Sequence, residues 1–226
     1  MFKYPFEVVE KFWSKLAETL NNAQHYSGEV EDFHKDEEEF ILSFLKDKDL
    51  KILELGCGTG RLLKTLSNNG FSKIYGIDIS EKMIQICRKS LSNSILLLQH
   101  DFRTRLPFES NFFDSILFIG NTLANVDRPD LVFKEARRIL KINGKFIIGC
   151  FNAKYMTDKI VKNYYGKLPK PFELKKFDKR TKTVYIGSLF AHWVTEKELK
   201  NLIKKSGLKA VSIQKKGIGL IAVAKK

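Results

Sequence analysis

The spacing of apolar residues changes once along the chain, near residue 50. Over residues 8–21 and 29–46, apolar side chains recur every three or four positions, which predicts two amphipathic helices. From residue 51 onward, short apolar runs alternate with further amphipathic stretches. Strands that alternate with helices predict an α/β fold, in which a parallel sheet carries helices on both faces.

The apolar runs after residue 50 predict seven strands. These span residues 51–55, 73–78, 94–99, 113–120 and 145–150 in the alternating part, and residues 208–214 and 220–224 as a final antiparallel pair. The helix before the fifth strand covers residues 129–140, and Asn143-Gly144 is its predicted exit turn. A capping box at Thr195 and Glu198 begins the last helix.

The segment that follows the fifth strand breaks the alternation. Residues 154–182 hold ten basic and three acidic side chains, with five aromatic ones between them. Basic residues interleaved with aromatics can bind RNA or an anionic metabolite. Alternatively, the segment is a lid whose aromatics pack on the core. Within it, residues 181–190 are predicted to form one strand that leads to His192.

The first strand runs into a turn with glycine at every second position, Gly56, Gly58 and Gly60. Such a turn, between a strand and a helix N-terminus, lets the backbone approach a ligand closely. It is one residue shorter than the G-x-G-x-x-G dinucleotide fingerprint, and no lysine follows it, which argues against a dehydrogenase and a P-loop NTPase. Asp78 ends the second strand, where a carboxylate can accept both ribose hydroxyls. Glu54 is a further acid just before the glycines.

These stretches, Glu54-Leu-Gly-Cys-Gly-Thr-Gly60 and Gly76-Ile-Asp78-Ile-Ser80, resemble motifs I and II of the class I S-adenosylmethionine-dependent methyltransferases. The similarity covers residues 51–151, and the wider pattern resembles the branch that includes quinone C-methyltransferases and glycine N-methyltransferases. The resemblance implies a Rossmann-like, seven-stranded, mostly parallel sheet. It also implies S-adenosylmethionine as cofactor and S-adenosylhomocysteine as product.

Further cofactor-site residues follow from this resemblance. Asp101-Phe102 resembles motif III, in which the carboxylate accepts a hydrogen bond from the adenine amino group and the next backbone amide meets a ring nitrogen. Asn121 follows the fourth strand and is expected to contact the cofactor or the acceptor, or alternatively to cap the next helix. The expected cofactor-binding residues are Glu54, Gly56, Cys57, Gly58, Gly60, Asp78, Ile79, Asp101, Phe102 and Asn121.

The resemblance also divides the single expected domain, residues 1–226, into four parts. They are an N-terminal helical cap (1–48), a cofactor-binding core (49–152), a substrate-recognition insertion (153–192) and a C-terminal helix with the antiparallel strand pair (193–226). Because a cap tyrosine reaches the cofactor in relatives, Tyr26 is one candidate catalytic residue; otherwise it packs on the cap. His192 is the second, since its ordinary pKa is near neutrality; otherwise it holds the lid in place. His34 is expected at the surface or at a helix cap, and no metal site is expected.

Charge is the unusual feature of the composition, with a net charge of +14. Such an excess suits an RNA partner. However, lysines outnumber arginines 32 to 8, and arginine is the residue favoured for gripping phosphates. Lysine-rich chains also arise from thermophilic adaptation or genome composition. Three widely spaced cysteines, with no signal peptide and no apolar run near ~20 residues, suit a reducing cytoplasm.

Three functions therefore stay open. The favoured one is methyl transfer to a small-molecule acceptor, because Gly120-Asn121-Thr122 resembles a stretch of the glycine N-methyltransferase-like enzymes. The missing Asn/Asp-Pro-Pro-Tyr motif of many nucleobase and amide methyltransferases points the same way. The second is an RNA (tRNA) or protein methyltransferase that docks through its basic insertion. The third is a non-catalytic cofactor-binding partner subunit, against which the intact Glu54, Asp78 and Asp101 count. The oligomeric state stays open.

Overall fold

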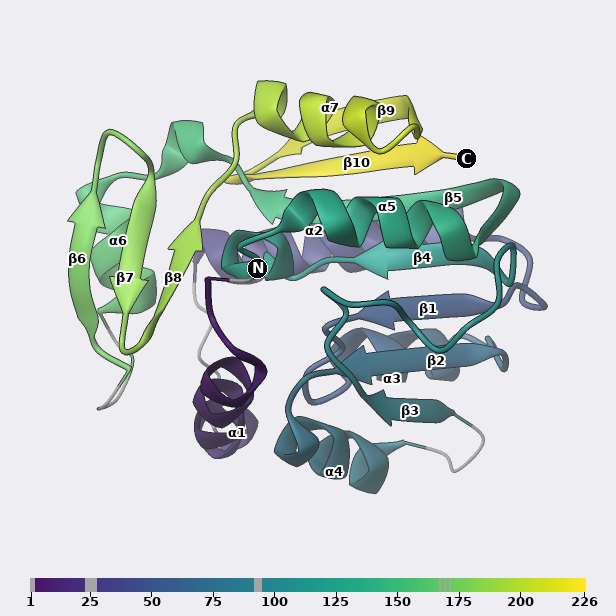
Figure 1. The fold of residues 1–226 in the computed structure, drawn as a ribbon, viewed down its shortest axis with the longest axis horizontal. Coiled ribbons are helices and arrows are strands. Elements are labelled where there is room, and N and C mark those ends of the chain that lie inside the picture. Colours follow the sequence, from purple (N-terminus) through teal and green to yellow (C-terminus); the bar gives the residue numbers. More distant parts are fainter. Residues whose placement is uncertain (1–2, 23–27, 92–94, 167, 169, 171) are drawn as a thin grey trace.

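The computed structural model describes residues 3–22, 28–91, 95–166, 168, 170 and 172–226. Its largest feature is a seven-stranded sheet in the order β3-β2-β1-β4-β5-β10-β9 (Figure 1). The strands are β1 (Ile52–Leu55), β2 (Ile74–Asp78), β3 (Leu96–Gln99), β4 (Phe113–Phe118), β5 (Leu140–Phe151), β9 (Lys209–Lys216) and β10 (Gly219–Lys225). Neighbours from β3 to β5 run parallel, and β10 is antiparallel to both β5 and β9. The predicted Rossmann-like fold is confirmed.

Helices cover both faces of this sheet because its central strands are apolar on both sides. The faces are visible within β1, where Ile52 joins one apolar cluster while Leu53 and Leu55 join the other. The first cluster is covered by α2 (Glu29–Phe44), α3 (Arg61–Asn68) and α4 (Glu81–Ser90), and the second by α5 (Pro129–Ile139) and α7 (Glu196–Lys205) (Figure 1).

Two glycines let α2 lie directly on the sheet. A Cβ atom at Gly149 in β5 would stand 1.8 Å from Oε1 of Glu37, and one at Gly219 in β10 would stand 2.1 Å from Cε2 of Phe33. Any other residue at these positions would push α2 outward. The close seating brings the Glu37 carboxyl group into the interior of the protein, where it is fully buried.

The basic segment forms a small sheet of its own beside the main one. It contains α6 (Asp158–Tyr165) and the antiparallel strands β6 (Leu174–Asp178), β7 (Thr183–Ile186) and β8 (Leu189–His192). The prediction of one strand over residues 181–190 is therefore wrong. Gly187 has a φ of 50° and turns the chain into a hairpin, so the Gly187-Ser188 pair that interrupts the apolar run is a turn signal that the prediction overlooked. Figure 1 shows this sheet near the carboxyl ends of β1, β2 and β4.

The prediction that Asn143-Gly144 lies outside the fifth strand is also wrong. β5 begins at Leu140, which pairs with Phe113, and the next pair is Ser115 with Lys145. The residues between them bulge out of the ladder, with Asn143 at a φ of 63°.

The two N-terminal helices, α1 (Phe6–Asn22) and α2, lie close to their predicted ranges. α1 packs against α4 at the carboxyl edge of the sheet, where it lies in Figure 1. None of the helices in the described part of the chain combines the length and the apolar character needed to cross a bilayer.

Candidate active site

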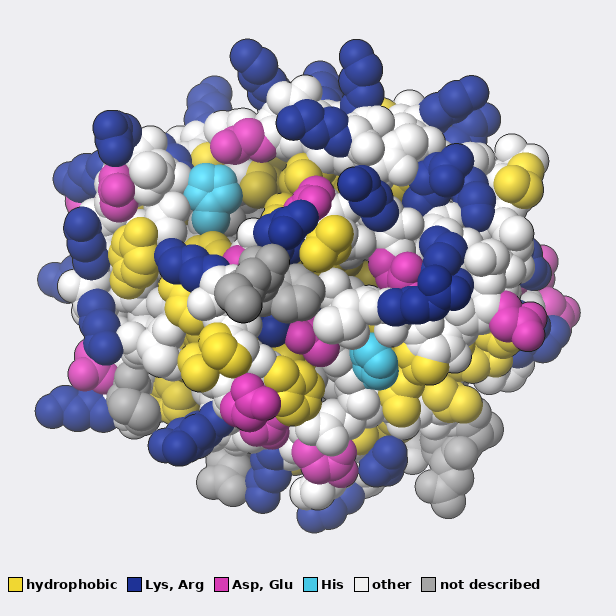
Figure 2. Space-filling model, in the orientation of Figure 1, with side chains coloured by type: hydrophobic (Ala, Val, Ile, Leu, Met, Phe, Trp, Pro, Cys, Tyr) yellow, Lys and Arg dark blue, Asp and Glu magenta, His cyan; other side chains and the backbone are white. Residues whose placement is uncertain are grey.

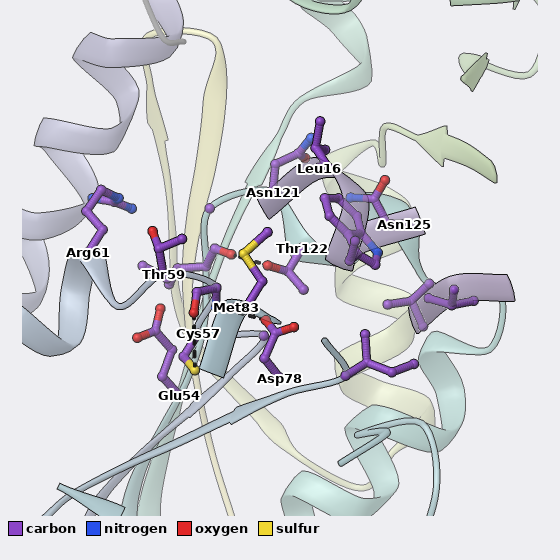
Figure 3. A pocket seen from close by; sticks show the side chains of 18 of the residues that line it. Leu16, Glu54, Cys57, Thr59, Arg61, Asp78, Met83, Asn121, Thr122 and Asn125 are labelled. Carbon is purple, nitrogen blue, oxygen red and sulfur yellow. Dashed lines mark hydrogen bonds between the residues drawn. The ribbon is translucent and has the colours of Figure 1, made fainter. Parts of the chain in front are cut away.

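A cavity of about 580 Å³ opens at the carboxyl ends of β1 to β4, between the sheet and the segments that cover it. This is where ligands bind in open α/β sheets. Every predicted cofactor residue except Gly60 lines this cavity. Figure 3 shows Glu54 and Asp78 below the cavity, with Asn121 and Asn125 above it.

The glycine turn forms the floor of the cavity. Its backbone adopts conformations that residues other than glycine avoid. Gly56 and Gly58 have φ values of 74° and 54°. A Cβ atom at Gly56 would stand 2.7 Å from Cγ2 of Thr122, whereas one at Gly58 would meet nothing within 4 Å. Gly60 plays another part, since a Cβ atom there would stand 2.5 Å from Sγ of Cys87. It lets the turn pack on α4 rather than line the cavity.

Asp78 is held in place by the turn beside it. Its Oδ2 accepts a hydrogen bond from the Gly58 amide at 2.8 Å, and its Oδ1 accepts one from the Ser80 amide at 2.9 Å. Burial raises the pKa of this carboxyl group to about 6. Each carboxylate oxygen carries a second lone pair, so Asp78 can still accept hydrogen bonds from two ligand hydroxyls.

Glu54 is a buried acid with unsatisfied bonding capacity. Its Oε2 is shielded from solvent and has no hydrogen-bond partner among the residues that the structure describes. Burial raises the pKa of Glu54 well above its ordinary value, although the nearby Arg61 opposes the shift. An unpartnered buried carboxyl group is unfavourable. A ligand ammonium group in the cavity would remove that penalty.

Asp101 has a strong partner that the sequence analysis missed. Its carboxylate accepts hydrogen bonds from the backbone N, Nε and Nη2 of Arg103, the last at 2.8 Å. Nε is shared between both oxygens, with Oδ2 at 3.1 Å, so each oxygen accepts two contacts from Arg103, and a ligand donor would compete with the shared Nε for one of them. The neighbouring Phe102 also lines the cavity, and its ring packs edge-on against Phe118 at 5.6 Å.

Asn121 lies at the turn after β4, with a φ of 61°. Its Oδ1 accepts a hydrogen bond from the Phe151 amide at 3.0 Å. It makes no side-chain capping bond to the short helix Thr122–Asn125, so the capping alternative is wrong. The side chain instead ties the β4 turn to the end of β5, and the residue lines the cavity.

Helix α2 contributes a histidine that the sequence analysis did not place at the cavity. His34 is only 7% exposed and lines the cavity, so its predicted surface position is wrong. Burial and the nearby Arg61 lower the pKa of His34 to about 3, which keeps the imidazole neutral. The sequence did contain a signal for this burial, because residues 34 and 37 fall on the same helix face as the apolar Val30 and Ile41.

Glu37 connects α2 to the turn after β4 and to the start of α3. Its Oε1 accepts a hydrogen bond from the Gly120 amide at 3.1 Å, and its Oε2 lies 3.7 Å from Nη2 of Arg61. Burial raises the pKa of Glu37 to about 7, and Arg61 opposes the shift. Arg61 also pairs with Glu38. Acids and one arginine thus gather where α2 meets the glycine turn.

The wall opposite the acids is mainly apolar and comes from segments distant in sequence. It consists of Val9, Trp13 and Leu16 of α1, together with Tyr164, Tyr165, Leu168 and Ile186 of the insertion. The Tyr165 hydroxyl accepts a hydrogen bond from Nε1 of Trp193 at 2.8 Å, which fixes the ring against the core. This wall can bind an apolar molecule through contact area.

One of the two catalytic candidates can be placed, and it lies away from the cavity lining. His192 is not among the cavity-lining residues; its Nδ1 lies 3.1 Å from Thr183 Oγ1 and its Nε2 lies 3.6 Å from Glu198. These contacts favour the alternative in which it holds the insertion to α7. Tyr26 lies outside the described residues. Across the described ranges, no group of three or more His, Cys, Asp or Glu side chains is arranged to hold a metal ion.

Comparisons with known proteins agree with this geometry. A family model described as a methyltransferase domain matches residues 53–148. The demethylmenaquinone methyltransferase of Lactococcus lactis subsp. lactis is 34% identical over 183 residues, which cover 76% of this chain and 71% of that protein. A crystal structure of a Pyrococcus horikoshii protein has 26% identity and a TM-score of 0.71, over 90% of this chain and 92% of its own. A Thermotoga maritima methyltransferase titled a possible histamine N-methyltransferase shares the fold at 21% identity, with a TM-score of 0.67 over 95% and 99% of the two chains.

Proposed function

Since this chain belongs to the class I S-adenosylmethionine-dependent methyltransferases, we propose that it methylates a small, largely apolar acceptor of the quinone type. The observation that carries the proposal is the division of one cavity into a polar wall and an apolar wall. The polar wall fits the cofactor. The apolar wall is the place for the acceptor.

Each acid of the polar wall matches one group of the cofactor. Glu54 would hold the ammonium group of the methionine part, which satisfies its unpartnered Oε2. Asp78 would accept the ribose hydroxyls, and Asp101 would accept one hydrogen bond from the adenine amino group. S-adenosylmethionine supplies an activated methyl group, so the protein contributes mainly alignment and exclusion of water.

The apolar wall supports an acceptor with little charge. Trp13 and Leu16 line the cavity from the cap, residues 1–48, and Tyr165 and Ile186 line it from the insertion, residues 153–192. We assign these two parts to acceptor recognition. A quinone-type ring suits aromatic and aliphatic neighbours, and the similar Lactococcus lactis protein is named for a quinone acceptor.

An RNA acceptor has less support. Figure 2 shows Lys and Arg side chains spread over the visible face of the molecule, with no single basic tract gathered around one opening. Nucleic-acid interfaces instead concentrate basic residues on one face or stripe. On this face, the positive charge therefore does not mark a docking surface for RNA.

A transfer assay tests the proposal. Protein is incubated with S-[methyl-³H]adenosylmethionine and either a chemically reduced 2-alkyl-1,4-naphthoquinone with its neighbouring ring carbon unsubstituted, histamine, or total tRNA. We expect label in the naphthoquinol, which is extracted into organic solvent. Label only in tRNA or only in histamine would overturn the acceptor proposal. The Asp78→Ala variant serves as the control for cofactor-dependent transfer.

A further inference from the structure

The guanidinium group of Arg103 joins three separate parts of the molecule. Arg103 is 7% exposed and lines the cavity. Its Nε and Nη2 donate to Asp101, while its Nη1 donates to the carbonyl oxygen of Tyr4 at 3.0 Å and to Oδ1 of Asp127 at 3.2 Å. A rigid fork of donors is what allows one side chain to serve several acceptors at once.

Asp127 also binds the N-terminal segment. Its second oxygen, Oδ2, accepts hydrogen bonds from the backbone amides of Lys3 at 2.5 Å and Tyr4 at 3.3 Å. The Tyr4 ring stacks on Phe190 of β8, with centroids 5.5 Å apart. We call residues 3–4 the strap, because they are bound to the core on one side and to the insertion on the other.

The strap lies next to both halves of the apolar wall. α1 begins at Phe6, directly after the strap, and carries Val9, Trp13 and Leu16 to the cavity. On the other side, Phe190 pairs with Tyr185 in the β7–β8 hairpin, which carries Ile186 to the cavity. A displacement of the strap would therefore loosen the apolar wall from both sides.

We infer that Arg103 is a positioning residue that couples the adenine subsite to the apolar wall through the strap. The inference rests on the proposed role of Asp101 as the acceptor for the adenine amino group. Three donors of Arg103 hold the carboxylate, and Nε is shared between its two oxygens, so a ligand amino group that binds Asp101 takes over part of this shared contact and fixes the Asp101–Arg103 pair. The fixed guanidinium then holds Tyr4 and Asp127. Because coupling between two sites is reciprocal, a closed strap also favours the adenine.

Hydrogen exchange measures this coupling without knowledge of the methyl acceptor. Backbone amide exchange of residues 3–22 is followed in the free protein and at saturating S-adenosylhomocysteine. We expect about tenfold slower exchange with the ligand, within the usual range of coupling between sites. Saturating S-inosylhomocysteine, which has a 6-oxo group in place of the amino group, should slow it much less. A purely structural Arg103 would not distinguish the two ligands.

Three variants separate the steps of the coupling. Arg103→Ala should weaken S-adenosylhomocysteine roughly tenfold and abolish the slowing at saturation. Asp127→Asn keeps the Asp101–Arg103 pair but releases the strap, so by reciprocity it should weaken S-adenosylhomocysteine by no more than about the tenfold coupling factor while losing most of the slowing. Arg105→Ala removes an exposed arginine two residues away and should behave like the unmodified protein.

The inference is overturned if S-adenosylhomocysteine binds but leaves exchange of residues 3–22 unchanged, if both ligands slow it equally, or if Asp127→Asn retains the full effect. Should Arg103→Ala fail to fold, Asp127→Asn and the ligand pair still decide the matter. Failure of the cofactor assignment looks different, since S-adenosylhomocysteine would then not bind the unmodified protein. Failure of the acceptor proposal would leave all of these results unaffected.

Discussion

The two walls of the cavity are built in different ways. The polar wall consists of turns at the ends of neighbouring strands, and its Asp78 is held by amides of the adjacent Gly58 and Ser80. The apolar wall is assembled from α1 and the insertion, which meet only in the folded protein. Under the proposed assignment of the two walls, the frame for the cofactor is set by the sheet, whereas the fit to the acceptor depends on how the covering segments pack.

The largest effect is expected at Glu37, which joins α2 to the ends of the strands that carry the polar wall. Its pKa is raised from 4.5 to about 7. Between these pH values the folded state keeps a proton on Glu37 that the unfolded chain releases. Its contribution to the free energy of unfolding is therefore present below pH 4.5 and lost as the pH rises through about 7. The full contribution is about 3 kcal/mol at roughly 1.4 kcal/mol per pKa unit.

Urea unfolding at pH 5 and pH 8 measures this contribution. Glu37→Gln should flatten the dependence on pH, while Glu39→Gln, at an exposed position of the same helix, should not. An equal slope in Glu37→Gln and the unmodified protein would show that Glu37 does not titrate in this range.

Asp78→Ala should damage the polar wall alone. We expect S-adenosylhomocysteine to bind more weakly by about 1–3 kcal/mol, the scale for losing a buried, hydrogen-bonded charge. Isothermal titration calorimetry checks the affinity, with Asp49→Ala as control because the Asp49 side chain is 84% exposed. An unchanged affinity would mean that Asp78 does not hold the ribose.

The raised pKa of Asp78 provides a second test of its assignment to the ribose hydroxyls. Ribose hydroxyls donate to the ionised carboxylate, and burial raises the pKa of Asp78 to about 6. Affinity for S-adenosylhomocysteine should therefore rise as the pH increases through about 6, and fall by up to roughly tenfold per pH unit below it. Titrations from pH 5 to pH 8 measure the curve. Asp78→Asn should be flatter, and equally steep curves for both proteins would assign the titration to another group.

Trp13→Ala should damage the apolar wall alone. Loss of the indole contact should raise the KM for the acceptor by about tenfold, on the scale of burying a large apolar side chain. The Kd for S-adenosylhomocysteine should stay within about twofold, a small fraction of that effect. Steady-state kinetics and calorimetry measure the two quantities, with the exposed Lys15→Ala as control. If the Kd for S-adenosylhomocysteine rose as much as the KM for the acceptor, the distinction between the two walls would be wrong.

The polar wall was largely predictable from sequence because its parts are local. A glycine turn after an apolar run marks Glu54, and the acid at the end of the next strand marks Asp78, whereas Asp101 was assigned by its resemblance to motif III of the family. The β7–β8 hairpin was less accessible, since a single glycine within a strand-like stretch, such as Gly187, can mark either a bulge or a turn.

The contacts of Arg103 and Glu37 could not be predicted in the same way. Arg103 reaches Tyr4 across 99 positions of sequence, and Glu37 reaches Gly120 across 83. No local spacing encodes such pairs. Only Glu37 left a trace, as a charged residue on the apolar stripe of its helix.

The most direct test of the two-walled cavity is a titration with both ligands. 2,3-Dimethyl-1,4-naphthoquinone, whose ring carbons are blocked against reaction, is titrated into protein saturated with S-adenosylhomocysteine, and the heat is measured. If the walls serve different ligands, one quinone binds per chain, at least as tightly as without S-adenosylhomocysteine. If S-adenosylhomocysteine abolishes quinone binding that the free protein shows, the two compete for one place, and the division of the cavity is wrong.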